Sequence, residues 1–144
     1  MADEQGQDAR GKQAGTSQRS VSTVTRVARV GFFALSAAFA LCVVVQIFLA
    51  GLAVFASPVY WARHTGFVHT FELLPLAMVL LALVGRLPRR LAWQSFGLYV
   101  LIFFMYFTAN IRALAPVVAA FHPVLAMTLF WAAVRVGVQA WTEV

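Results

Sequence analysis

Four long apolar runs, separated by short breaks, make up most of this chain. They cover roughly Gly31–Phe55, Gly66–Val84, Leu91–Ala109 and Leu114–Val134. A helix needs about 20 apolar residues to cross a bilayer, and each run is close to or above that length. Because the connections are short, consecutive helices must run antiparallel. The pattern therefore predicts an all-α fold, an up-down-up-down four-helix transmembrane bundle.

The composition excludes a soluble domain of this size. Of the 144 residues, 62% are hydrophobic and only 11% are charged, whereas a soluble surface needs far more charge. The net charge of +6 does not indicate nucleic-acid binding, because the arginines flank the apolar runs and form no basic face interleaved with aromatic residues. We expect the lipid bilayer as the environment and no nucleic-acid partner. A membrane-protein partner and a homo-oligomer both stay open.

The N-terminal region differs from the rest of the chain. Residues 1–26 are predicted to be a disordered cytoplasmic tail, because the first twenty are rich in Gln, Gly, Ser and charge. The apolar run that follows is longer than the roughly 7–15 residues of a signal-peptide core, so we expect it to be a retained helix of a membrane domain at 27–141. Cys42 is the only cysteine, which excludes an intramolecular disulfide, and a small core residue is the expected role.

The basic residues are distributed asymmetrically about the four runs, which predicts the orientation. Only Arg63 and Arg112 fall on the side opposite the N-terminus. Because basic residues are retained on the cytoplasmic side of short loops, both termini are predicted to be cytoplasmic. The nine basic residues on that side are Arg10, Lys12, Arg19, Arg26, Arg29, Arg86, Arg89, Arg90 and Arg135. In the loop after the second run, Gly85 is a suitable helix C-cap and Pro88 prevents continuation of the helix.

Polar side chains inside the runs gather at one depth, in the outer half of the predicted bundle. Such groups are costly in hydrocarbon, so they are candidates for function. Glu72 is the only acidic residue in any run, and His69 at i−3 is its expected partner, with Gln46 or Arg112 as alternatives. A hydrogen-bonded cluster that joins helices and a ligand, ion or proton site are both consistent with this layer. Its members are Gln46, His64, His69, Glu72, Tyr106, Asn110 and His122.

Two of the histidines suggest a more specific site. His69 and His122 lie on the second and fourth helices, which run parallel and are diagonal in a square bundle, about 14 Å apart when neighbouring axes are about 10 Å apart. That separation suits two imidazoles on one haem iron, so haem b with His69 and His122 as ligands is one hypothesis. His122 precedes Pro123, so the last helix can begin at Pro116 or at Pro123. The phenylalanines available to pack a macrocycle are Phe96, Phe103, Phe104 and Phe107.

A simple metal centre is disfavoured. His64, His69, Glu72 and His122 are suitable ligand types for zinc, but His64 and His69 are five residues apart and project about 140° from each other around a helix. We therefore predict no metal ion bound by side chains alone. The chain also lacks a Ser/His/Asp set, a Cys/His pair, a phosphate loop and a dinucleotide motif, which favours a non-enzymatic role.

Several short motifs resemble a family of small bacterial four-helix membrane proteins, a domain of unknown function. They are the string from Gln46 to Leu52, a histidine-bearing start of the second helix, Gly85–Arg89 and His122-Pro123. The resemblance covers about residues 27–138 and implies the four-helix architecture and a bacterial inner membrane. It singles out Gln46, Gly51, one of His64 and His69, and His122. It supplies no activity.

Three functions remain open on the sequence alone. The first is a non-enzymatic bundle or accessory subunit whose polar layer is structural. The second is a bis-histidine b-type haem protein that transfers electrons in the membrane. The third is a small proton-coupled transporter that uses Glu72.

Overall fold

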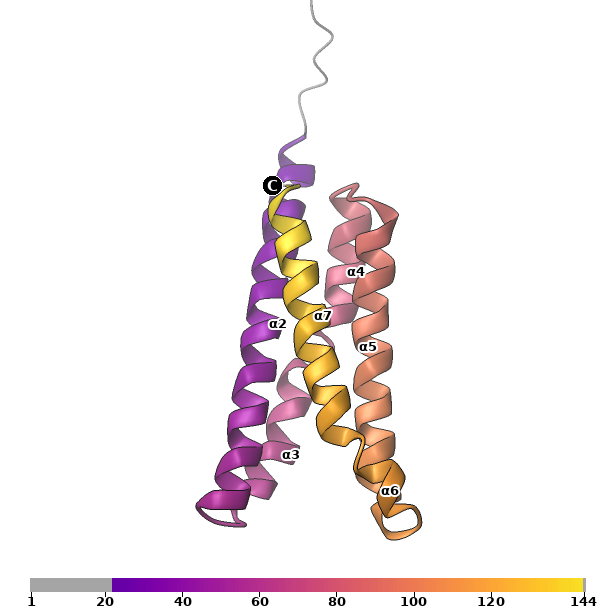
Figure 1. Cartoon of the computed structure of the whole chain (residues 1–144). Helices are drawn as coiled ribbons and strands as arrows, with labels where there is room; N and C mark the ends of the chain where they lie inside the picture. The colour runs from indigo at the N-terminus through magenta and orange to yellow at the C-terminus, as the bar shows by residue number, and fades with distance from the viewer. Residues whose placement is uncertain (1–21, 144) are drawn as a thin grey trace, which may run out of the picture.

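The computed structural model describes residues 22–143, and this part of the chain is helical with no strand. Figure 1 shows the helices arranged side by side as an elongated bundle. The four predicted spans are confirmed at Thr23–Phe55, Tyr60–Val84, Arg89–Ala113 and Pro116–Trp141, each long and apolar enough to cross a membrane. The elements are α2 (Thr23–Phe55), α3 (Tyr60–Phe71), α4 (Leu74–Val84), α5 (Arg89–Asn110), the 3-10 helix η1 (Ile111–Ala113), α6 (Pro116–Ala119) and α7 (His122–Trp141).

The spans form a closed ring. Helix α2 packs against α4 and α7, and α5 packs against the same two helices, so the second span lies opposite the fourth. The beginning of α2 and the end of α7 lie at one end of the bundle, together with the turn after α4, and we call this the Arg86 end. The opposite end, which carries η1 and α6, is called the Arg112 end. Of the predicted tail, residues 1–21 lie outside the described part, and α2 already begins at Thr23.

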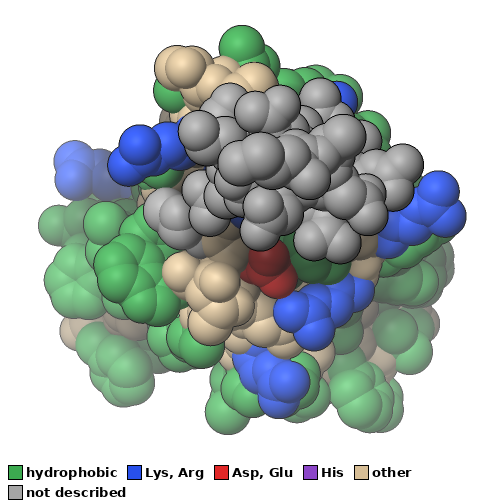
Figure 2. Space-filling view, turned by 90° about the horizontal axis from the view of Figure 1, so that it is seen from above, with side chains coloured by type: hydrophobic (Ala, Val, Ile, Leu, Met, Phe, Trp, Pro, Cys, Tyr) green, Lys and Arg blue, Asp and Glu red, His purple; other side chains and the backbone are tan. Residues whose placement is uncertain are grey.

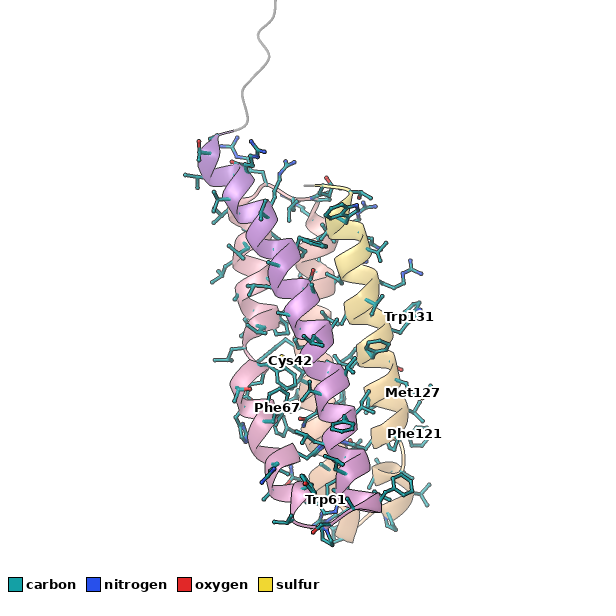
Figure 3. The ribbon with its side chains drawn as sticks, turned by 90° about the vertical axis from the view of Figure 1, so that its left-hand side faces the viewer. Cys42, Trp61, Phe67, Phe121, Met127 and Trp131 are labelled. Carbon is teal, nitrogen blue, oxygen red and sulfur yellow. The ribbon has the colours of Figure 1, made fainter. Side chains whose placement is uncertain are left out.

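The tightly packed core lies in the half of the bundle nearest the Arg86 end. Two small polar residues are buried there without cost, because the hydroxyl of Ser36 donates to Phe33 O at 2.7 Å and that of Ser95 donates to Leu91 O at 2.9 Å. The largest fully buried side chains all belong to this half: Phe32, Phe39, Pro75, Met78, Leu91, Leu98 and Val136, with Ser36 and Ser95. Phe121, just before α7, and Met127 and Trp131 on α7 instead project away from the bundle, as residues facing lipid do (Figure 3).

Two spans are interrupted, the second near its middle and the fourth in the other half. The second span breaks at Glu72 and Leu73, and Pro75 in the first turn of α4 lacks the N–H that would continue the hydrogen-bond ladder. The fourth span breaks between α6 and α7, with Pro116 and Pro123 each in a first turn. The sequence treats the second span as one continuous helix and leaves the fourth with two alternative starts. The structure has both starts: α6 begins at Pro116, and α7 begins at His122, directly before Pro123.

A network of arginines and main-chain carbonyls closes the Arg86 end. The Arg29 side chain on α2 donates to Gly85 O at 3.0 Å and to Glu143 O at 3.1 Å, and the Glu143 carboxylate lies 3.5 Å from Arg90. Gly85 is the C-cap of α4, as predicted, but the left-handed conformation falls on Arg86, with φ of 50°. Figure 2 looks onto this end and shows basic side chains around its rim.

Candidate ligand-binding cavity

A cavity of about 990 Å³ lies in the half of the bundle nearest the Arg112 end. It forms because α3, beyond the break at Glu72, packs closely only on α2, whereas α4 packs on both α2 and α5. The pair α2–α3 therefore diverges from the pair α5–α7, and side chains of all four spans line the space between them. Most of the lining is apolar, but all three histidines of the chain contribute to it.

His64 is held by a reciprocal pair of hydrogen bonds with α2. Its Nδ1 lies 3.0 Å from Gln46 O, and Gln46 Nε2 donates to His64 O at 2.8 Å. Because a carbonyl oxygen only accepts, Nδ1 must carry the proton in this contact, which leaves Nε2 of a neutral ring with a free lone pair. No hydrogen-bond partner of Nε2 is found among residues 22–143.

His122 is held in the same way on the opposite side of the cavity. It is the first residue of α7, and its Nδ1 lies 3.1 Å from Met105 O and 3.1 Å from Thr108 Oγ1, both on α5. The Met105 carbonyl again fixes the proton on Nδ1 and leaves Nε2 as an acceptor. His64 and His122 thus each bind a main-chain carbonyl of a neighbouring long helix through Nδ1. In both rings Nε2 has no partner in the described part of the chain.

His69 belongs to a different arrangement, a triad with Glu72 and Tyr106. Its Nδ1 lies 3.3 Å from both carboxylate oxygens of Glu72, and the Tyr106 hydroxyl lies 3.1 Å from the same nitrogen. The hydroxyl also donates a short hydrogen bond to Glu72 Oε2. The imidazole and the Tyr106 ring are nearly parallel, with centroids 5.8 Å apart. The side chain of His69 is 62% exposed and that of Glu72 is 27% exposed, so this triad lies at the open side of the cavity.

Further polar groups stand around the same space. Gln46 Oε1 is buried and has no hydrogen-bond partner among the described residues, although its Nε2 is satisfied. Asn110, which donates to Tyr106 O at 2.8 Å, and Arg112 line the cavity from the end of α5 and from η1. Arg63, the other basic residue at this end, instead lies over the Tyr60 ring at 5.0 Å and is not part of the lining.

The structure therefore brings together most of the polar layer that the sequence singled out. The members of this polar layer that line the cavity are Gln46, His64, His69, Tyr106, Asn110 and His122. Glu72 does not line it but is joined to two residues that do. Its partners are His69, as expected, and Tyr106, and neither Gln46 nor Arg112 bonds to it. Sequence reasoning missed Thr108, although a hydroxyl two residues after Tyr106 in an apolar run was a usable signal.

Among residues 22–143, no group of three His, Cys, Asp or Glu side chains is placed to hold a metal ion. The fold and the cavity define the class: a small multi-pass membrane protein with four helical spans. Over residues 46–111, just under half of the chain, it matches the model of a family of unknown function, DUF6220. This confirms the predicted resemblance over those residues, whereas His122 lies beyond the matched stretch. Comparisons with curated proteins and with solved structures give no significant match.

Proposed function

We propose that this membrane protein binds haem b in the cavity, with His64 and His122 as the two axial ligands. The observation that carries the proposal is the matched setting of the two rings. Both line one cavity from opposite spans, and in both Nδ1 is bound to a main-chain carbonyl while Nε2 is left without a partner in the described chain. Metal-ligating histidines characteristically donate their second ring N–H to a carbonyl or carboxylate, which fixes the tautomer and the ring orientation.

The cavity also suits the two chemical parts of haem. Its volume of about 990 Å³ falls at the upper end of the range of roughly 300–1,000 Å³ typical of cofactor sites, and its walls are mostly apolar, as a macrocycle requires. Haem also carries two propionate carboxylates. Arg112 and Asn110 line the cavity close to the Arg112 end, where they would pair with these carboxylates. Bound there, haem would supply one-electron transfer, and the chain would hold it in place and keep its ring in an apolar environment.

This proposal changes one ligand of the pair that the sequence favoured. The sequence suggests His69 with His122, from their similar depth on two parallel, diagonal helices, and leaves open which of His64 and His69 matters. His69 is mostly exposed, and both Glu72 and Tyr106 are within hydrogen-bond distance of its Nδ1. His64 is half-buried, and its setting matches that of His122. We therefore assign His64 to the iron and leave His69 to the triad.

Absorption spectra of the protein purified with haem available would test the assignment. We expect a low-spin b-type spectrum with one haem per chain. His64→Ala and His122→Ala should each abolish it, whereas His69→Ala, a histidine of the same cavity, serves as the matched control and should keep it. Loss in His69→Ala with retention in His64→Ala would overturn the assignment in favour of the original pair.

The competing function is a structural bundle or accessory subunit whose polar layer joins helices. It predicts a well-folded, colourless protein after haem reconstitution, and such a result would end the haem proposal. What favours a binding role is the cavity itself. A layer that serves only to join helices would be packed, because voids forfeit dispersion contacts on every wall.

We further propose that the Arg86 end is cytoplasmic, in a bacterial inner membrane. The asymmetry of nine basic residues against two supports this orientation. A green fluorescent protein fused after Val144 should then be fluorescent, and alkaline phosphatase fused at the same position should be inactive. Active phosphatase at that position would reverse the orientation and place the cavity in the cytoplasmic leaflet.

A further inference from the structure

The triad of His69, Glu72 and Tyr106 is not used by the haem site and has a chemistry of its own. The Glu72 carboxylate accepts from Tyr106 and lies 3.3 Å from His69 Nδ1. Because a carboxylate only accepts, this contact places the proton of a neutral His69 ring on Nδ1 and leaves Nε2 as an acceptor. The His69 side chain is 62% exposed, and no partner of its Nε2 is found among the described residues.

The position of the triad limits what can reach it. Glu72 lies at the break between α3 and α4, within a span, and its neighbour Leu73 is 62% exposed, as a side chain facing lipid would be. A ligand that reaches this depth must dissolve in hydrocarbon and yet donate a hydrogen bond to His69 Nε2. Aromatic side chains lie on this side of α5: the Tyr106 ring stacks on His69, and Phe103, one turn before Tyr106, is 66% exposed.

From this geometry we propose that the triad binds a lipid-soluble hydroquinone, one of whose hydroxyls donates to His69 Nε2. An aliphatic lipid alcohol would gain little from the aromatic surface and has no proton that a carboxylate-supported imidazole could remove. A hydroquinone ring can stack beside Tyr106, and its hydroxyl proton is acidic enough to be transferred during oxidation. Glu72 would stabilise the resulting imidazolium, as a carboxylate does in other histidine–carboxylate pairs.

The redox step rests on the haem proposed above. When the hydroquinone O–H bond breaks, the proton passes to His69 Nε2. A bound ferric haem would be the acceptor of the one electron released with it. Full oxidation to the quinone releases a second proton and a second electron, which follow the same route in a second oxidised molecule of the protein. One hydroquinone therefore reduces two haem-loaded chains and releases two protons in all.

Binding can be tested without haem. The apoprotein in lipid nanodiscs is photolabelled without oxygen with an azidohydroquinone, the reduced form that can donate to His69 Nε2, and the labelled peptides are mapped by mass spectrometry. We expect labels on the spans Tyr60–Val84 and Arg89–Ala113, and a roughly tenfold loss in His69→Ala, the size expected for one lost hydrogen bond. Thr70→Ala is the matched control, since Thr70 is the adjacent exposed residue and its hydroxyl bonds only to Phe67 O. Labelling that His69→Ala leaves unchanged would overturn the site.

The electron step has a separate readout. A short-chain hydroquinone added without oxygen to the oxidised, haem-loaded protein should reduce two haems per molecule. Glu72→Gln should slow this reduction at least about tenfold while leaving the haem spectrum unchanged, because it weakens the proton acceptor without touching an axial ligand. Reduction at the wild-type rate in Glu72→Gln would contradict the role of the triad. If no haem binds, the proposed function fails, and the photolabelling still decides the quinone site.

Discussion

The two halves of this bundle share the same four spans but are built in different ways. Toward the Arg86 end, phenylalanine, leucine and methionine side chains are fully buried and the helix ends are joined by Arg29. Toward the Arg112 end, two spans are interrupted and a cavity lined by three histidines takes the place of a packed core. The packed half therefore stabilises the fold, so the other half can retain a cavity.

Helix breaks produce this division. A continuous second span would keep α3 alongside α5 and fill the space with apolar side chains. The interruption at Glu72 and Leu73, next to Pro75, allows α3 to follow α2 instead. The polar residues of the layer then face an internal space rather than lipid. Binding energy from a ligand would offset the packing lost there.

The largest contrast between the halves should appear in the loss of an aromatic ring. Phe32 is completely buried, and Phe48, on the same helix, is 62% exposed. Phe32→Ala should lower the free energy of unfolding by about 2 kcal/mol or more, the cavity term for a lost phenyl ring of roughly 100 Å³. Phe48→Ala should change it by less than about 0.5 kcal/mol. Unfolding in mixed micelles measures both, and equal losses would mean that the Arg86 half is not the tighter one.

Two glycines provide a smaller test of the same contrast. A Cβ on Gly85 would lie 2.9 Å from Leu81 O and 3.3 Å from the Arg29 side chain, whereas a Cβ on Gly51, in the cavity wall, meets nothing within 4 Å. Gly85→Ala should therefore destabilise the fold by about 1–2 kcal/mol through overpacking. Gly51→Ala should be neutral or stabilise by up to about 1 kcal/mol, through helix propensity. Thermal unfolding in detergent compares them, and a destabilising Gly51→Ala would show that the cavity wall is packed.

The arginine contacts at the Arg86 end should give the smallest effect. Arg29→Ala removes two hydrogen bonds to Gly85 O and Glu143 O, which should cost about 1 kcal/mol in a partly exposed setting. It should also speed proteolysis at the C-terminus, because Glu143 loses its main-chain anchor. Arg26→Ala, three residues earlier and exposed, is the control. Identical proteolysis in both variants would mean that the contacts of Arg29 do not hold this end together.

The sequence predicts the fold well because the bilayer imposes strong rules. Run length, short loops and hydropathy define four antiparallel spans, and the pairing of Glu72 with His69 follows from their spacing on one helix face. The membership of the polar layer was predictable for the same reason, since polar residues in apolar runs are few and conspicuous. All of these inferences rest on local sequence pattern or on the lipid bilayer as the environment of the chain.

Long-range geometry could not be predicted in this way. The local sequence does not indicate that α3 packs on α2 beyond the break near Pro75. It also does not indicate the hydrogen bonds of Thr108 with His122 and of Arg29 with the Glu143 carbonyl. The choice between His64 and His69 depends on which ring nitrogen is occupied and by what. It therefore depends on contacts with neighbouring helices, which residue spacing along one helix does not reveal.

Native mass spectrometry of the intact protein, expressed with haem available and released from detergent, decides whether the cavity holds haem. We expect one haem b per chain, lost in His64→Ala and in His122→Ala and retained in His69→Ala. A bare chain, or a chain that carries only phospholipid under the same conditions, would contradict it.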